Sequence, residues 1–177
     1  AVQVFSAAGF RKGSLRDVAA LTGLSQAGLL HHFPTKVSLL MAVLEWRDQD
    51  TLSRMGVPLP VGTDVLRSLV REVEHNSRTP ALVELHVIMS AEATSPDHPA
   101  HAYFVRRYTA VRELLADCFE YAADRGEVRP GLDAAAAASL VTALMDGLQI
   151  QWLLDREGVD MANALRSYLQ TLLAVDL

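Results

Sequence analysis

Apolar residues recur along this chain at spacings of three and four, which is the period of amphipathic helices. The alternating apolar and polar pattern of strands between tight turns is nearly absent. Val2, Phe5 and Ala8 already form half of an apolar stripe, so we expect the sequence to start inside a helix and the native chain to begin further upstream. The pattern as a whole predicts an all-α fold of about nine helices.

The first four predicted helices are short and have clear end signals. Gly9 is expected to end the first, and Ser14 to Asp17 has the Ser-x-x-Asp form of a capping box that begins the second. Gly23 ends the second helix, Ser25 caps a third from Gln26 to about His32, and Pro34 ends that one. A fourth helix follows Thr35 and fades near Arg54, before a linker from Gly56 to Gly62.

Five further helices are predicted in the remainder of the chain. Their expected ranges are 64–76, 80–93, 98–125, 134–156 and 160–175. The helix at 98–125 carries a long apolar stripe and should form the central element of a larger body. The sequence therefore predicts two domains, at 1–44 and at 45–177.

The second and third predicted helices, joined through Gly23, Leu24 and Ser25, have the helix-turn-helix arrangement, in which the second helix enters the DNA major groove. Leu24 and Leu29 are expected to anchor this pair in the core. The outward positions are then candidate base readers: Gln26, Ala27, Gly28, Leu30 and His31. A glutamine can bond two edge atoms of adenine, and alanine or leucine can touch a thymine methyl group.

The charge distribution agrees with a DNA-reading head. The chain carries a net charge of −5, but its first 47 residues hold five Lys or Arg and two Asp or Glu, a local charge of +3, and the rest carries −8. A small basic segment on an acidic body is typical of a DNA reader with a separate regulatory domain. Lys36, at the start of the fourth helix, would add its charge to the free N–H groups of that helix end and bind a phosphate.

The head resembles the tetracycline-repressor (TetR) family in a set of motifs spread over residues 1–44. They are Phe5-x-x-x-Gly9-Phe10, Ser14-Leu15-Arg16-Asp17-Val18-Ala19, Gly23-Leu24-Ser25, Leu29-x-His31-His32-Phe33-Pro34-x-Lys36 and Leu39-Leu40. The resemblance implies a homodimeric repressor that releases a palindromic operator in double-stranded DNA when a small molecule binds the C-terminal domain. By position it implies phosphate contacts for Ser14, Arg16, His32 and Lys36, and base-edge contacts for Gln26, Gly28 and His31. Leu30 and Gly28 depart from the tyrosine and threonine that are common in the family, so the operator sequence cannot be transferred.

The last two predicted helices have broader apolar faces than the outside of a monomer should show. Gly147 would let a partner backbone approach closely, and the stretch from Asp146 to Asp155 is similar to the penultimate helix of many family members. In those members the last two helices form a four-helix interface. The predicted interface residues are Leu144, Gly147, Leu148, Trp152, Leu165 and Leu169; an intramolecular hairpin is the alternative.

An effector site is expected among the middle helices, lined by apolar and aromatic groups with a few polar ones. The candidates are His86, Met89, Phe104, Tyr108, Met145 and Gln149. His98-x-x-His101, near Asp97 and Glu92, admits a metal site, but helix capping explains the segment and no metal or other cofactor is predicted. Cys118 lies on an apolar stripe and should be an inert core thiol.

Other classes of function receive little support from this sequence. It has no phosphate-binding glycine loop, nucleophile elbow, His-Glu-x-x-His or Cys-x-x-Cys, so no enzyme is predicted. Without a secretion leader or 18 uninterrupted apolar residues, we expect a cytoplasmic protein that does not enter membranes. The remaining alternatives are a dimeric helical adaptor that does not bind DNA, and a transcriptional activator on the same fold.

Overall fold

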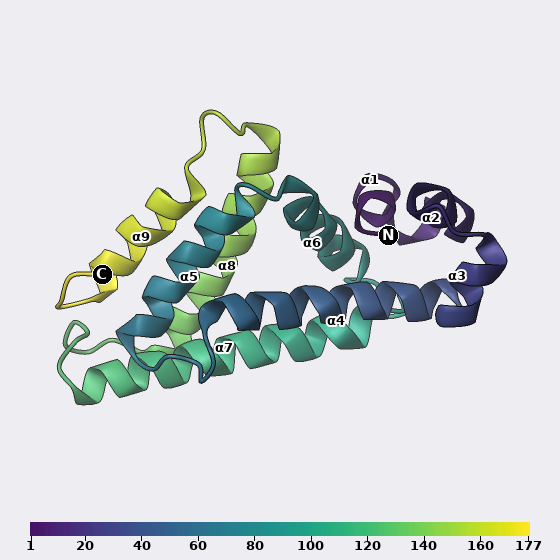
Figure 1. Cartoon of the computed structure of the whole chain (residues 1–177). Helices are drawn as coiled ribbons and strands as arrows, with labels where there is room; N and C mark the ends of the chain where they lie inside the picture. Colours follow the sequence, from purple (N-terminus) through teal and green to yellow (C-terminus); the bar gives the residue numbers. More distant parts are fainter. The chain divides into compact units, whose positions relative to one another are not determined.

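The computed structural model describes all residues from 1 to 177 and consists of α-helices joined by short loops (Figure 1). The nine helices are α1 (Val2–Lys12), α2 (Leu15–Thr22), α3 (Gln26–His32), α4 (Lys36–Met55), α5 (Thr63–Asn76), α6 (Pro80–Glu92), α7 (His101–Asp124), α8 (Ala134–Leu154) and α9 (Met161–Leu172). The only β pairing is an isolated bridge between Val128 and Leu173. The predicted all-α fold with nine helices is confirmed.

Three helix ends differ from the sequence-based ranges by more than two residues. Gly9 kinks α1 without ending it, since its positive φ of 69° interrupts a helix that continues to Lys12. α7 begins at His101, because the residues before it form turns in which the His98 ring accepts the Ala100 N–H. α9 stops at Leu172, because the extended residue Leu173 bridges to Val128.

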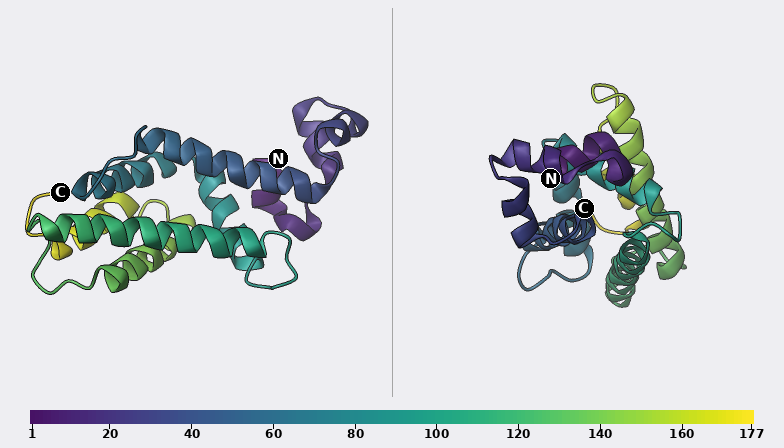
Figure 2. Two further views of the ribbon diagram at one scale, coloured as in Figure 1. Left: turned by 90° about the horizontal axis from the view of Figure 1, so that it is seen from below. Right: turned by 90° about the vertical axis from the view of Figure 1, so that its right-hand side faces the viewer.

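The chain divides into two compact units. The first comprises residues 1–50 and 80–104, and the second comprises residues 51–79 and 105–177. This division differs from the predicted boundary at residue 44, because α6 lies alongside α1 and belongs with the first unit (Figures 1 and 2).

The first unit is held together by an apolar core and by polar contacts between distant segments, one of which joins α1 to α6. Phe5, Val18, Leu29 and Leu40 are buried in it. Where Gly9 kinks α1, the freed N–H of Phe10 donates to Glu92 Oε2 of α6 at 2.8 Å. A side chain at residue 9 would collide with the Glu92 carboxylate, so this joint requires glycine both for space and for its positive φ.

In the second unit α9 packs against both α5 and α8. Fully buried side chains of these helices and of α7 form its core; they include Leu66, Leu115, Phe119, Val141, Leu165 and Leu169. Asp133 and Asp160 begin α8 and α9 as N-caps, accepting the N–H groups of Ala136 and Asn163 at 3.0 Å.

Candidate functional site

The turn between α2 and α3 is built by residues whose local preferences match their positions. Ser14 caps α2, accepting the Asp17 N–H at 3.1 Å and donating its hydroxyl to the Asp17 carboxylate at 2.6 Å. Gly23 ends α2 in the left-handed region (φ 69°, ψ 14°), which glycine enters at little cost. The predicted helix, turn and helix are therefore present with the expected caps.

α3 is a short helix with one buried anchor and an exposed remainder. Ser25 Oγ accepts the Gly28 N–H at 3.0 Å, and Leu29 is buried. Leu24 is 46% exposed, so its predicted anchoring role is wrong; it follows the left-handed glycine, and Val18, Ala19 and Leu29 fill the core instead. Of the candidate readers, Gln26, Ala27 and His31 are exposed, as is His32, while Gly28 and Leu30 are partly exposed.

The two cationic candidates near α3, Arg16 and Lys36, differ in whether their charged groups already form hydrogen bonds within the chain. Arg16 is exposed on α2. The Lys36 ammonium donates to the carbonyls of Arg11 and Gly13 at 3.3 and 3.1 Å and lies 4.5 Å from the centre of the Phe10 ring. Because an ammonium has three N–H donors, one remains for a phosphate, but Lys36 also holds the end of α1 in place.

The N-terminus of α4 is closed by a reciprocal cap. Thr35 Oγ1 accepts the Ser38 N–H and Ser38 Oγ accepts the Thr35 N–H, both at 3.0 Å. The first N–H groups of α4, including that of Lys36, lie outside this pair of bonds. An N-terminus of this kind attracts phosphate through its free N–H groups and helix dipole.

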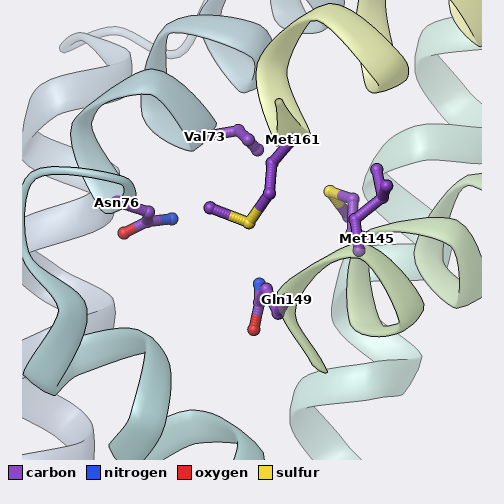
Figure 3. Close-up of a pocket in the computed structure, with 6 residues that line it drawn as sticks. Val73, Asn76, Met145, Gln149 and Met161 are labelled. Carbon is purple, nitrogen blue, oxygen red and sulfur yellow. The ribbon is translucent and has the colours of Figure 1, made fainter. Parts of the chain in front are cut away.

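A small cavity lies in the second unit, between α5, α8 and α9 (Figure 3). Its lining residues are Val73, Asn76, Met145, Leu148, Gln149 and Met161. Two of them, Met145 and Gln149, were predicted to contact an effector. Asn76 was missed, although a polar residue three positions after Val73 on the apolar stripe of α5 is a signal that the sequence does contain.

The other predicted effector residues lie elsewhere in the molecule. His86, Met89 and Phe104 are buried in the first unit, where the His86 ring is tilted by 54° against the Phe104 ring and its Nδ1 lies 3.5 Å from the Arg47 guanidinium. Tyr108 belongs to the second unit and is partly exposed. The six candidates therefore do not line the one cavity described above.

The predicted interface residues on α8 and α9 divide into buried and accessible groups. Leu148, Trp152, Leu165 and Leu169 are buried within the chain, so their side chains cannot supply the exposed surface assigned to them. Leu144 and Gly147 remain partly exposed. The hairpin alternative explains the buried group, because α8 and α9 pack on each other.

The exposed side of α8 is apolar in a continuous line. We call Leu140, Ala143, Gly147, Ile150 and Leu154 the α8 stripe; all are exposed or partly exposed and recur at spacings of three and four. By length and composition α8 is apolar enough to cross a membrane, and its most apolar 18 residues are only 33% buried in the chain; α3 with α4 passes the same test only across a 63° bend. The α8 stripe is thus a large apolar surface that the chain itself leaves uncovered.

The histidine and cysteine candidates have structural surroundings. His101 Nδ1 lies 2.8 Å from the Ala93 carbonyl, and His98 Nε2 lies 3.4 Å from Glu92 Oε2. No group of three or more His, Cys, Asp or Glu side chains is arranged to hold a metal ion. Cys118 is buried and donates its thiol to the Gly62 carbonyl at 2.8 Å; burial and, secondarily, the Glu127 charge raise its pKa to about 12.

Two family models match separate parts of the sequence. Residues 1–43 match the model described as bacterial regulatory proteins, tetR family. Residues 63–174 match the model described as BetI-type transcriptional repressor, C-terminal. Together they cover the head and nearly all of the remaining helices.

Individual proteins similar to this chain include transcriptional regulators. The chain is 24% identical to the HTH-type transcriptional regulator UidR of Escherichia coli K12, over 91% of this chain and 80% of UidR. It is 26% identical to the HTH-type transcriptional regulator TtgR of Pseudomonas putida, over 97% of this chain and 85% of TtgR. The structure of FadR from Bacillus subtilis in complex with stearoyl-CoA has the same fold, with a TM-score of 0.80, 15% identity and coverage of 98% of this chain and 94% of FadR.

Proposed function

Because this chain belongs to the TetR family of bacterial regulatory proteins, we propose that it is a homodimeric repressor that binds a palindromic operator through α3 and releases it when a small molecule binds. The observation that carries this proposal is the form of α3. It is capped by Ser25, anchored by Leu29 and exposed at Gln26, Ala27 and His31. A short helix held in this way presents its N-terminal residues to base edges.

The residues of the head receive separate roles in this proposal. Gln26 bonds an adenine edge, Ala27 or Leu30 touches a thymine methyl group, Gly28 lets the backbone approach, and His31 lies near the bases. Contacts to the sugar–phosphate backbone come from four residues that set the position of the head but carry no sequence information: Ser14, Arg16, His32 and Lys36. The Ser14 hydroxyl already bonds Asp17, which limits it to a supporting contact.

Dimerisation is required because two recognition helices must reach successive major grooves about 34 Å apart. We assign the contact to the α8 stripe, packed against the same stripe of a second chain. Gly147 supports this assignment. A glycine inside a helix lowers helix stability by about 1 kcal/mol relative to alanine. A Cβ atom at residue 147 would meet only the Gln151 side chain, at 4.0 Å, so packing within one chain does not require glycine at this position. Close approach of a second helix would explain it.

Regulation by a small molecule and a cytoplasmic location complete the proposal. FadR, with the same fold, was crystallised with stearoyl-CoA, which shows that a protein of this fold can hold a small molecule. A ligand regulates only if its affinity differs between the DNA-competent and DNA-incompetent states. No catalytic role is assigned to the chain.

The proposal can be tested by selecting bound duplexes from random DNA with the purified chain and then screening metabolites for release of the selected duplex. We expect a palindromic site whose half-sites are about one helical turn apart. Release by a metabolite would identify the effector. Absence of any enriched duplex would overturn the proposal and favour an adaptor that does not bind DNA.

A further inference from the structure

The cavity between α5, α8 and α9 contains polar groups but no charged ones. Asn76 and Gln149 supply two amides, and the other four lining side chains are apolar. An ion placed there would lose its hydration without gaining a partner charge, at a large cost in free energy. The chemistry of the lining therefore excludes a charged group from the part of a ligand that enters.

The two amides have unused hydrogen-bonding capacity. Gln149 Oε1 is buried and has no hydrogen-bond partner in the chain. The hydrogen bonds formed by Asn76 use its backbone carbonyl, which accepts from Thr79. A buried acceptor without a donor costs free energy, so a molecule that brings an O–H or N–H group to Gln149 Oε1 would recover it.

The remaining lining can adapt its shape. Met145 and Met161 face the cavity from α8 and from the first residue of α9 (Figure 3). The empty space has room for at most one water molecule, so a larger guest must displace these side chains. Methionine changes rotamer at low cost and accepts guests of varied shape, including aromatic rings.

We propose that this cavity is the effector site and that it binds a small, uncharged, mostly apolar molecule carrying one hydrogen-bond donor. The donor bonds Gln149 Oε1, Asn76 bonds a polar atom on the same side, and the apolar part lies against the two methionines and Val73. This inference rests on the proposed function, because it takes ligand-controlled release of DNA as its premise.

The position of the cavity gives binding a route to the proposed dimer contact. Gln149 and Met145 lie on the side of α8 that faces away from the α8 stripe, while Asn76 ends α5 and Met161 begins α9. A guest that separates these three helices shifts α8, and a shift of α8 changes how two α8 stripes meet. Binding is thereby coupled to the spacing of the two recognition helices, provided that the guest prefers one spacing.

The test compares three probes of similar size on the purified protein by calorimetry: phenol, toluene and benzoate. Phenol carries a donor, toluene lacks it, and benzoate adds a charge. We expect phenol to bind about tenfold more tightly than toluene, as one recovered hydrogen bond predicts, and benzoate not to bind. Gln149→Met keeps the side-chain length but removes the acceptor, so the preference for phenol over toluene should become smaller.

Two further variants complete this test. Gln49→Met makes the same exchange at an exposed position on α4 and should keep the tenfold preference for phenol. Asn76→Leu, measured in parallel, should weaken phenol more than toluene, and it provides the readout if Gln149→Met does not fold.

The outcomes of this test distinguish failure of the effector-site proposal from failure of the proposed function. If no probe binds at millimolar concentration while operator binding is intact, the cavity holds water only and the effector assignment is wrong. Tighter binding of benzoate than phenol, or an unchanged phenol preference in Gln149→Met, would also overturn it. Loss of all DNA binding in the wild-type chain would refute the proposed function instead.

Discussion

Cys118 shows how position in the fold determines the chemistry of one side chain. Its thiol is enclosed on α7 and bonded to the Gly62 carbonyl. Burial penalises the thiolate and the nearby Glu127 charge adds to that penalty, so the pKa rises from 9.0 to about 12. Because the thiolate is the reactive form, the environment opposes a redox-sensing role.

This environment predicts slow alkylation of native Cys118. At pH 8 the higher pKa lowers the thiolate fraction about a thousandfold relative to the unfolded chain. Iodoacetamide should therefore label the protein rapidly in urea and barely at all without it, as measured by mass spectrometry over time. Equal labelling rates in the two conditions would contradict the buried position.

His98 is a second titratable group whose protonation is coupled to folding. Its Nδ1 accepts the Ala100 N–H at 3.2 Å, so the neutral ring carries its proton on Nε2, towards Glu92. Burial lowers the pKa of His98 below its ordinary 6.5; the charge and hydrogen bonding of Glu92 oppose this shift, and Arg11 adds to it. The folded chain therefore favours the neutral ring.

The sign of the resulting pH dependence can be predicted. The unfolded chain binds a proton at His98 as the pH falls below 6.5, before the folded chain does. The stabilisation by neutral His98 is therefore complete above pH 6.5 and is lost as the pH falls through the lower folded pKa. Between pH 7.5 and 5.5 the free energy of unfolding should drop more in wild type than in His98→Gln.

Urea denaturation at the two pH values measures this difference. His32→Gln, an exposed position, is the matched control and should keep the wild-type drop. An identical drop in His98→Gln would show that His98 is not the coupled group.

In the proposed complex with DNA, α2 and α3 have different roles. Contacts from α2 to phosphates position the protein on the duplex, and contacts from α3 to base edges give sequence specificity. Gln26 is exposed at the start of α3, where a side chain can reach base edges, and Arg16 is exposed on α2, where its charge can meet a phosphate. Lys36 is less suited to isolating the phosphate contribution, since its ammonium also holds the carbonyls at the end of α1. Replacing Lys36 would therefore lower both the affinity for DNA and the stability of the folded chain, and the two effects could not be separated.

The two exposed positions should respond differently to truncation. Gln26→Ala should cost about 1–3 kcal/mol on the selected operator and relax the preference at one or two base pairs. Arg16→Ala should weaken binding to all duplexes alike and reduce the slope of log affinity against log salt by about one. Fluorescence anisotropy with matched and mismatched duplexes at several salt concentrations measures both effects.

Arg106→Ala removes the same charge from an exposed position on α7 and should leave both quantities unchanged. Uniform losses on every duplex from both Gln26→Ala and Arg16→Ala would refute the separate roles.

At the scale of the whole molecule, the α8 stripe is an apolar surface that the chain's own helices do not cover. Its leucine and isoleucine side chains are more exposed than a monomer would favour, with Leu154 at 83% and Leu140 at 58%. A membrane or a second chain could cover them. A helix-turn-helix regulator needs two copies, and Gly147 in the middle of the stripe suits close helix packing, so we favour the second chain.

This choice predicts that a charge placed on the stripe separates the dimer. Ile150→Asp should bury an unpaired carboxylate in the interface and raise the dimer dissociation constant by about a hundredfold or more, equivalent to about 3 kcal/mol. Light scattering after size-exclusion chromatography should then report a monomer, and operator affinity should fall with it. Thr109→Asp on an exposed part of α7 is the control and should remain dimeric.

A monomeric wild type would leave the α8 stripe without its proposed partner. Binding of that monomer to lipid vesicles would then favour the membrane alternative.

Local features of the sequence were sufficient for the helices and for the helix-turn-helix. Caps such as Ser14, Ser25 and Asp133 act on N–H groups within three residues, and Gly23 ends α2 through its own backbone freedom. Interactions of such short range can be predicted from sequence order alone. The exposed reading face of α3 followed from the same local pattern.

Contacts between distant segments could not be predicted in this way. An apolar position on a helix can face the chain's own core or a partner, and only packing shows that Leu165 and Leu169 face inward while Leu140 does not. The contact between the Gly9 kink and Glu92 joins residues more than 70 positions apart in the sequence. The cavity is lined by residues from three different helices, among them Asn76, Gln149 and Met161. These contacts depend on how the helices pack against one another, and the spacing of apolar residues along each helix does not determine that packing.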